Sequence, residues 1–337
     1  MSQPELMEIR GLKKHFAVNR LGRRGVVRAV DGVSLTIGRG VTLGLVGESG
    51  CGKSTLGRLL LRLIQPTGGE VLLNGENLLL YNKEQMRNAR RSVQMIFQNP
   101  YASLNPRMRI LDAVKAPLDV FREGSDADRL ERVREIFALV GLDEAHLRRF
   151  PHEFSGGQRQ RIAIARALVL SPELIICDEP VSALDVSVRA QVLNLMSDIQ
   201  EKLRVSYLFI SHDLGVVHHI SASVAVMYLG KIVELAPKRD LYDNPLHPYT
   251  RALLSAVLQP WAAAERECVV LGGEAPSPLN VPSGCRFRTR CPDVCERCAK
   301  EEPELRDVGG GHLAACLRLS AGAGAYERVT PDEDFYI

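Results

Sequence analysis

A glycine-rich octapeptide constrains this chain more than any other part of its sequence. It fits the pattern G-x-x-x-x-G-K-[ST] and reads Gly47-Glu48-Ser49-Gly50-Cys51-Gly52-Lys53-Ser54. The apolar run Val41–Val46 precedes it, and a helix is predicted over Lys53–Ile64. In such a turn, backbone N–H groups and the helix start surround a triphosphate, Lys53 reaches the outer phosphates, and the Ser54 hydroxyl binds Mg²⁺. The octapeptide and Thr55 are therefore predicted to bind a magnesium nucleotide.

The other apolar runs predict a sheet that is covered on both faces. They are apolar throughout instead of alternating: Leu174–Cys177, Tyr207–Ser211 and Val224–Leu229. Such runs are typical of parallel strands in α/β proteins. A helical stripe of apolar residues over Val188–Leu203 follows the first of them. The chain has 337 residues, 45% of them hydrophobic, and can bury a full core, so the predicted fold class is α/β.

Two stretches depart from this pattern. Between Gln98 and Pro172 the sequence is helical with no obvious strand, and an apolar stripe runs over Asp128–Val140. We interpret this stretch as a helical insertion in the sheet domain. Beyond Pro237 the sequence becomes rich in Pro, Gly and Cys, which interrupt any long element and predict a small loop-rich appendage.

Charge and hydropathy exclude several classes of protein. Lys and Arg total 43 against 40 acidic residues, and a net charge of +3 is far from the dense basic patch of a dedicated nucleic-acid binder. Solvated arginines are the simplest explanation of a basic loop predicted at Arg20–Arg28. No window approaches the ~18 uninterrupted apolar residues of a membrane span. We therefore expect a soluble, cytosolic chain whose membrane role, if any, is peripheral.

Two carboxylates end the strand predicted at Leu174–Cys177. In open parallel sheets the carboxyl ends of the strands face the ligand crevice, so Asp178 and Glu179 are expected near the phosphates. Asp178 suits the Mg²⁺ shell. Glu179 suits a base that orients the attacking water and accepts its proton. Without the octapeptide, a solvated strand end would be the better interpretation.

A second glycine turn carries a resemblance to a known family. Ser155-Gly156-Gly157-Gln158 starts a predicted helix and would by itself be an ordinary helix cap. Its companions are Gln98, the tetrapeptide Ser182-Ala183-Leu184-Asp185 after the carboxylates, and Ser211-His212-Asp213 after the next strand. Together they resemble the ATP-binding cassette (ABC) family from Leu6 to about Leu235. The resemblance implies a P-loop NTPase (RecA-like) ABC ATPase core that hydrolyses ATP.

The resemblance also implies roles for single residues. Gln98 would contact Mg²⁺ and sense a transmembrane partner, Asp185 would lie in the loop that joins two ATPase subunits, and His212 would reach the γ-phosphate. Phe16 matches the aromatic residue that stacks on adenine, with His15 as the competing candidate. The turn Ser155–Gln158 would close over ATP held by another subunit, which makes a second ATPase subunit necessary.

Three further segments resemble the ATP-binding subunits of bacterial dipeptide and oligopeptide importers. They are Pro151–Phe154, Pro180–Ser187 and Asn244–Thr250. The resemblance divides the chain into a nucleotide-binding domain (residues 1–258, with a helical subdomain at about 98–170) and a C-terminal region of the oligopeptide/dipeptide-transporter type (259–337).

This subfamily implies partners and a location. The expected partners are a second, homologous ATPase subunit, two membrane-spanning permease subunits and an external peptide-binding protein, with no nucleic acid. The expected location is the cytoplasmic face of the cell membrane. Nickel and glutathione importers share the subfamily and stay open as alternatives. A soluble ABC ATPase acting on ribosomes or DNA is a more distant one, because that class generally carries two cassettes or a long coiled-coil insertion.

The cysteines of the last part of the chain need a separate explanation. Of eight in the sequence, Cys285, Cys291, Cys298 and Cys316 match positions at which some peptide importers carry a [4Fe–4S] cluster. Thiolates from a loop-rich segment are suitable ligands for such a cluster. Cys295 could replace Cys298, and zinc or free or paired thiols remain the alternatives.

Overall fold

The structure is a computed structural model that describes residues 5–20, 23–99, 103–256, 271–274 and 276–319. The chain divides into two compact units. The first unit comprises residues 1–7, 36–42 and 72–211, and the second comprises residues 8–35, 43–71 and 212–337. The glycine octapeptide and the C-terminal region therefore belong to the same unit.

The first unit contains four described strands, three of them in a parallel sheet, and the larger helices. Its strands are β5 (Glu76–Asn77), β6 (Val93–Ile96), β7 (Leu174–Asp178) and β8 (Ser206–Ser211). Its helices are α2 (Lys83–Ser92), α4 (Ile110–Phe121), α5 (Asp126–Leu139), α6 (Gly156–Leu168) and α7 (Val186–Leu203). Short 3-10 turns lie at Leu78–Leu80, Glu144–Arg148 and Pro151–Glu153.

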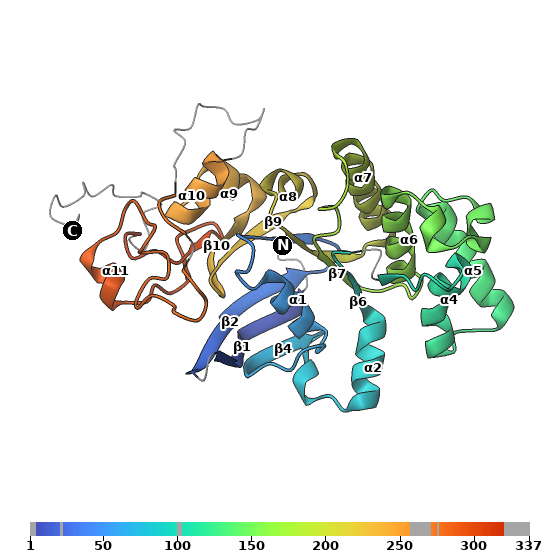
Figure 1. Cartoon of the computed structure of the whole chain (residues 1–337), viewed down its shortest axis with the longest axis horizontal. Coiled ribbons are helices and arrows are strands. Elements are labelled where there is room, and N and C mark those ends of the chain that lie inside the picture. The colour runs from blue at the N-terminus through green and yellow to red at the C-terminus, as the bar shows by residue number, and fades with distance from the viewer. Residues whose placement is uncertain (1–4, 21–22, 100–102, 257–270, 275, 320–337) are drawn as a thin grey trace. The chain divides into compact units, whose positions relative to one another are not determined.

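Burial explains why the strands of this unit are apolar throughout. The sheet order is β8-β7-β6, and Ile176 in β7 lies opposite Met95 on one side and Leu208 on the other. Every residue of β7 and β8 is buried. Helices α4, α5 and α6 pack against one another (Figure 1). The described residues between Gln98 and Pro172 contain helices and no strand.

The second unit holds most of the remaining elements. Its strands are β1 (Glu5–Arg20), β2 (Arg23–Gly38), β3 (Thr42–Val46), β4 (Gly68–Leu73), β9 (Ser223–Tyr228), β10 (Lys231–Pro237), β11 (Arg306–Asp307) and β12 (Leu313–Ala314), the first four with ends in the first unit. Its helices are α1 (Lys53–Leu60), α8 (Leu214–Ile220), α9 (Lys238–Asp243), α10 (Pro248–Ser255) and α11 (Glu296–Lys300).

The C-terminal region extends the sheet that carries the glycine octapeptide. The strand order is β11-β12-β10-β9-β3. Strand β3 runs parallel to β9, with Leu45 opposite Ala225, and β10 pairs antiparallel with β12, with Glu234 opposite Ala314. The appendage predicted beyond Pro237 is therefore loop-rich, but its two short strands are tied into the sheet by backbone hydrogen bonds.

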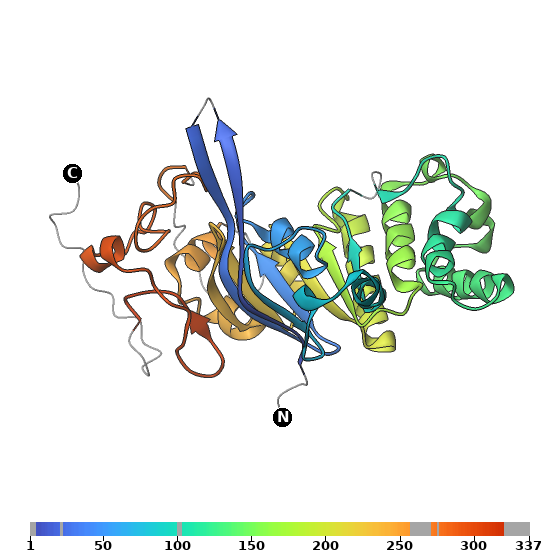
Figure 2. The ribbon, with the colours of Figure 1, turned by 90° about the horizontal axis from the view of Figure 1, so that it is seen from below.

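One prediction about the N-terminal part is wrong. The loop predicted at Arg20–Arg28 is largely strand, because Arg23–Arg28 opens β2, which lies beside β1 in a long ribbon (Figure 2). Between Gly25 and Arg28 the exposure of the residues alternates, as in a two-stranded ribbon with one better-covered face. Arg28 lies on the more exposed face, where its side chain stays in contact with water.

Among the helices of the described residues, none combines the length and the apolar character that a membrane crossing requires.

Candidate nucleotide site

The glycine octapeptide forms a turn that folds around its own lysine. It connects β3 to α1, and the N-cap of α1 is Gly52 in the left-handed region. The Lys53 side chain is buried and its Nζ donates hydrogen bonds to the carbonyl oxygens of Gly47 at 2.6 Å and Glu48 at 3.0 Å. A glycine N-cap contributes no side-chain oxygen to the first turn of the helix. This helix start therefore has the positive end of the helix dipole and a buried ammonium beside it, as an anion site requires.

Glycine is required where this turn meets neighbouring strands. A Cβ on Gly52, whose φ is +115°, would lie 2.0 Å from the carbonyl oxygen of Ala29. A Cβ on Gly47 would lie 2.2 Å from the carbonyl oxygen of Met227. Both obstacles are backbone atoms that cannot rotate away. The turn is thus held tightly against β2 and β9.

Cys51 has a structural place in the turn. Its side chain is buried, and burial raises the pKa of its thiol. Its carbonyl oxygen accepts a hydrogen bond from the N–H of Gly230 at 2.8 Å. A protonated, buried thiol is a poor nucleophile, so redox chemistry at this position is not favoured.

The two carboxylates at the end of β7 differ in their backbone conformation, and one of them is strained. Asp178 is the last residue of β7 and is buried. Glu179 follows with φ of +48°, a conformation that non-glycine residues rarely adopt. Its N–H donates to the carbonyl oxygen of Ile210 at 3.0 Å, and Gln98 Nε2 donates to Glu179 Oε2 at 2.8 Å. The structure therefore joins Gln98 to Glu179, a contact that the sequence did not predict.

The second glycine turn begins α6 with a complete capping box. Ser155 Oγ accepts a hydrogen bond from the N–H of Gln158 at 3.3 Å, and Gln158 Oε1 accepts one from the N–H of Ser155 at 3.0 Å. A Cβ on Gly157 would lie 2.4 Å from Val188 Cγ1, whereas one on Gly156 would make an ordinary contact at 3.5 Å. Asp185 caps the start of α7 with its backbone but not with its side chain.

The residues predicted for adenine and the γ-phosphate occupy exposed or half-buried places in the second unit. Phe16 lies in β1 with Lys14 Nζ 4.9 Å from its ring centre. The competing candidate His15 is engaged elsewhere, since its Nε2 lies 2.8 Å from Asp31 Oδ1. His212 lies directly after β8 and is exposed.

The expected iron–sulfur cluster finds no support in the described part of the chain. There, no three His, Cys, Asp or Glu side chains form a group that could hold a metal ion. Burial raises the pKa of the thiols of all four proposed ligands, to about 12 for Cys298: Cys285, Cys291, Cys298 and Cys316. The closest pair is Cys295 and Cys298, with sulfur atoms 3.4 Å apart. Cys268 lies outside the described residues.

Two residues that the sequence did not predict contact the glycine turn, one from α10 and one from the C-terminal region. Arg290 forms an ion pair with Glu48 at 2.8 Å, and the Tyr249 hydroxyl accepts a hydrogen bond from the N–H of Glu48 at 2.9 Å. Arg290 and Glu48 are 242 positions apart along the chain. No local pattern predicts such a contact.

The parallel strands, the glycine turn with its buried lysine and the paired carboxylates define a P-loop ATPase of the ABC type. A family profile described as "ABC transporter" matches residues 30–182, and one described as "Oligopeptide/dipeptide transporter, C-terminal region" matches residues 233–298. Among solved structures, the dimeric post-hydrolysis state of the ATP-binding cassette MJ0796 bound to ADP and Pi has a TM-score of 0.63 and 26% identity. It covers 69% of this chain and 99% of that one.

Curated relatives match over nearly the whole chain. The oligopeptide transport ATP-binding protein AppF of Bacillus subtilis is 52% identical over 321 residues, which are 94% of this chain and 98% of that protein. The dipeptide transport ATP-binding protein DppF of Escherichia coli is 51% identical, over 95% of this chain and 96% of that protein. The chain therefore belongs to the ABC transporter family, within the group of oligopeptide and dipeptide transport ATP-binding proteins.

Proposed function

We propose that this chain is the ATP-binding and ATP-hydrolysing subunit of a heteromeric ABC transporter that imports dipeptides or oligopeptides. The observation that carries the proposal is the start of α1, where a glycine N-cap and the buried Lys53 provide a site for phosphate. The names of the relatives support peptides as the transported class.

Each predicted site residue has a proposed part in hydrolysis. The octapeptide and Thr55 hold the phosphates, with Lys53 at the β and γ positions, and Phe16 stacks on adenine. Glu179 orients the attacking water and accepts its proton, while His212 contacts the γ-phosphate. The Ser54 hydroxyl, the Asp178 carboxylate and the Gln98 amide are hard oxygen donors of the kind that Mg²⁺ prefers. Bound Mg²⁺ would neutralise charge that develops on the phosphates.

The proposal includes a second ATPase subunit. The turn Ser155-Gly156-Gly157-Gln158 would contact ATP held by that subunit, and Asp185 would lie in the loop that joins the two subunits. Contacts made only while the terminal phosphate is present would favour the closed pair, and hydrolysis would release it. The C-terminal region, residues 259–337, would accompany a nucleotide-binding domain at 1–258.

We place the subunit at the cytoplasmic face of the cell membrane as a peripheral component. Its partners would be the homologous ATPase subunit, two membrane-spanning permease subunits and an extracytoplasmic peptide-binding protein. This arrangement supplies ATP from the cytoplasm and solute from the opposite side, so the chain itself need not touch the peptide.

Transport by the reconstituted assembly tests this proposal. This chain, the cognate ATPase and both permease subunits are reconstituted in vesicles that enclose Mg-ATP, the binding protein is added outside, and uptake of labelled dipeptides and oligopeptides is measured. We expect uptake that stops when this chain carries Glu179→Gln. Uptake of nickel or glutathione in place of peptides would reassign the solute. ATPase activity that is unaffected by the permease subunits would contradict a transport role.

A further inference from the structure

The C-terminal region contacts the phosphate-binding turn through a bidentate ion pair. Arg290 Nη1 lies 2.8 Å from Glu48 Oε2, and Arg290 Nη2 lies 3.1 Å from Glu48 Oε1. The Arg290 side chain is 8% exposed and that of Glu48 is 30% exposed. A paired, largely buried guanidinium holds a carboxylate in one orientation better than a surface lysine would. The hydrogen bonds from Arg290 to Glu48 raise the pKa of Arg290, which therefore stays charged.

The same turn residue is held through its backbone by a second side chain. The N–H of Glu48 donates to the hydroxyl of Tyr249, which follows the start of α10 and is fully buried. The Tyr249 ring lies 4.7 Å from that of Tyr228 in β9 and 5.4 Å from that of Phe287, measured between ring centres. Packed rings with few rotamers form a stiff support. Phe287 is three residues before Arg290, so one packed cluster positions both contacts to Glu48.

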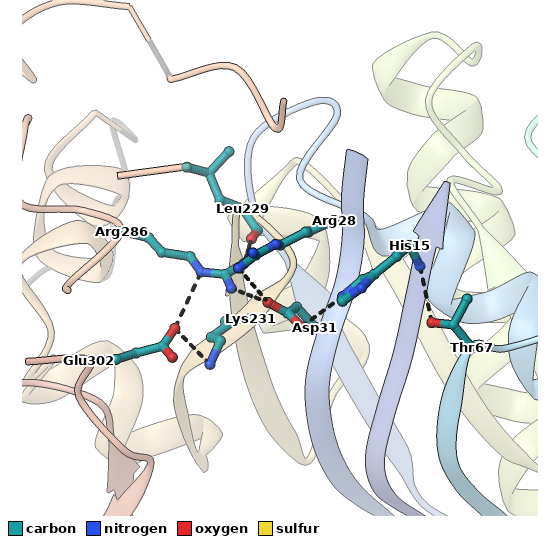
Figure 3. Close-up of polar contacts among 8 residues, drawn as sticks. All are labelled: His15, Arg28, Asp31, Thr67, Leu229, Lys231, Arg286 and Glu302. Carbon is teal, nitrogen blue, oxygen red and sulfur yellow. Dashed lines mark hydrogen bonds and ion pairs between the residues drawn. The ribbon is translucent and has the colours of Figure 1, made fainter. Parts of the chain in front are cut away.

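A neighbouring arginine connects the same C-terminal segment to β1. Arg286 donates to the carbonyl oxygen of Leu229 and pairs with Asp31, whose other oxygen lies 2.8 Å from His15 Nε2 (Figure 3). Burial alone would raise the pKa of Asp31, but its hydrogen bonds with Arg286 and His15 lower it below its usual range. His15 precedes Phe16, the residue proposed to stack on adenine. The segment that contains Arg286 and Arg290 is therefore linked to two parts of the proposed nucleotide site: to β1 beside Phe16 through Asp31, and to the glycine turn at Glu48.

We propose that Arg290 is a positioning residue for ATP binding, through which the C-terminal region neutralises and orients Glu48 in the phosphate-binding turn. An unpaired carboxylate in that turn would repel the triphosphate, and in a partly buried place this repulsion is only weakly screened. The Arg290 guanidinium removes this repulsion while the Tyr249 hydroxyl fixes the backbone. This inference rests on the proposed ATP site and adds to it a requirement for a correctly folded C-terminal region.

A double substitution tests whether ATP binding depends on the charge of Glu48 or on the packing of the Arg290 side chain. We expect Arg290→Ala to raise the Kd for Mg-ATP about tenfold, or ~1.4 kcal/mol, and to raise KM with little change in kcat. Adding Glu48→Gln to Arg290→Ala removes the unpaired charge, so the Kd should return to within about threefold of wild type. The matched control is Arg297→Ala, which removes an exposed ion pair with Glu301 in the same region and should leave the Kd unchanged.

The outcomes are distinguishable by equilibrium titration of the full chain, with thermal unfolding to confirm that each variant is folded. Wild-type protein that binds no ATP would overturn the proposed function itself. Wild-type and Arg290→Ala proteins that bind ATP equally would overturn the positioning role alone. Equal weakening in Arg290→Ala and in the double variant would also overturn it, because a structural defect is not relieved by removing the Glu48 charge.

Discussion

Two helices of this protein begin with a glycine-rich turn, and their first turns are built in opposite ways. Helix α1 follows Gly52, which has no side chain to offer, and its first residue is the buried Lys53. Helix α6 follows Ser155, whose hydroxyl forms a reciprocal capping box with Gln158. Glycine content therefore does not by itself distinguish a phosphate-binding turn from a self-capped one.

A helix start is available to a ligand only where the chain leaves its first N–H groups without an acceptor of its own. The N–H groups of a first turn need acceptors, and a capping box supplies them from the chain itself. At α6 an incoming phosphate would compete with the Ser155 hydroxyl, whereas at α1 the N-cap offers no competitor. We expect the turn at α1 to bind ATP in the absence of a second subunit. The turn at α6 should contribute only when a second subunit presents its nucleotide.

Gly52→Ala tests the α1 turn and has the largest expected effect. The added Cβ would meet the backbone oxygen of Ala29 at 2.0 Å, in a left-handed conformation that alanine disfavours. We expect loss of detectable Mg-ATP binding in an equilibrium titration. The control is Gly50→Ala, where φ is +81° but nothing lies within 4 Å of the added Cβ, so only ~1–2 kcal/mol of strain is expected. Equal binding by both variants would contradict the close packing of the turn.

Glu179→Gln separates nucleotide binding from hydrolysis. Glutamine keeps an oxygen that can accept the hydrogen bond from Gln98 but cannot take a proton from water. Phosphate release should therefore fall by about 10²–10⁴-fold, while the Kd for Mg-ATP at the α1 turn stays nearly constant. Steady-state phosphate release and equilibrium titration measure the two quantities. Wild-type turnover in this variant would exclude Glu179 as the base.

Lowering the pH should reduce the free energy of unfolding of the unit that contains α1, because this unit holds a buried histidine. His247 Nδ1 accepts a hydrogen bond from the N–H of Tyr249 at 3.1 Å, and burial lowers the pKa of His247 to about 4. The unfolded chain binds this proton near pH 6.5, so the free energy of unfolding should fall as pH drops from about 6.5 to 4, by ~3 kcal/mol at most.

Denaturant melts across this pH range check that prediction, with His247→Gln as the comparison. The variant should lose the part of the acid dependence that comes from His247. The capping box at α6 consists of Ser155 and Gln158, and neither side chain titrates between pH 4 and 6.5. This helix start therefore does not add to the acid dependence of the free energy of unfolding. An identical acid dependence in wild type and variant would show that His247 does not take up the proton.

Ser155→Ala tests the self-capped turn and has the smallest expected effect on stability. Loss of the cap should lower the free energy of unfolding by ~1 kcal/mol, with no change in the Kd for Mg-ATP of the isolated chain. The matched control is Ser125→Ala, because Ser125 forms a similar capping box with Asp128 at the start of α5. Only Ser155→Ala should reduce ATP turnover in the presence of the partner subunit. Equal turnover in the two variants would contradict a role for Ser155 at the partner's nucleotide.

The sequence predicted those parts of the fold whose residues act locally. The run Leu174–Cys177 became β7 with one added residue, and the stripe at Val188–Leu203 became α7. Buried parallel strands and amphipathic helices impose a periodicity that can be read within a few residues. The predicted helix Lys53–Ile64 ends earlier, at Leu60, and Arg62 adopts a left-handed φ of +49°.

Long-range contacts were not predictable in the same way. The start of β2, Arg23–Arg28, shows no strict alternation of apolar and polar residues, so its arginines resembled a basic loop. The ion pair between Glu48 and Arg290 depends on where α10 and the C-terminal segment pack, which no local motif specifies. The cysteine spacing suggested a cluster, but spacing along the chain does not show whether the side chains come together in a metal-binding group, and within the described residues they do not.

Calorimetric titration of the Glu179→Gln chain with Mg-ATP measures nucleotide binding at the start of α1, because heat from hydrolysis is then suppressed and only binding is observed. The uncapped start of α1 predicts saturable binding that is lost when Gly52→Ala is added. A folded Glu179→Gln chain that gives no binding heat at any ATP concentration, or one whose binding survives Gly52→Ala, would contradict the assignment of this turn.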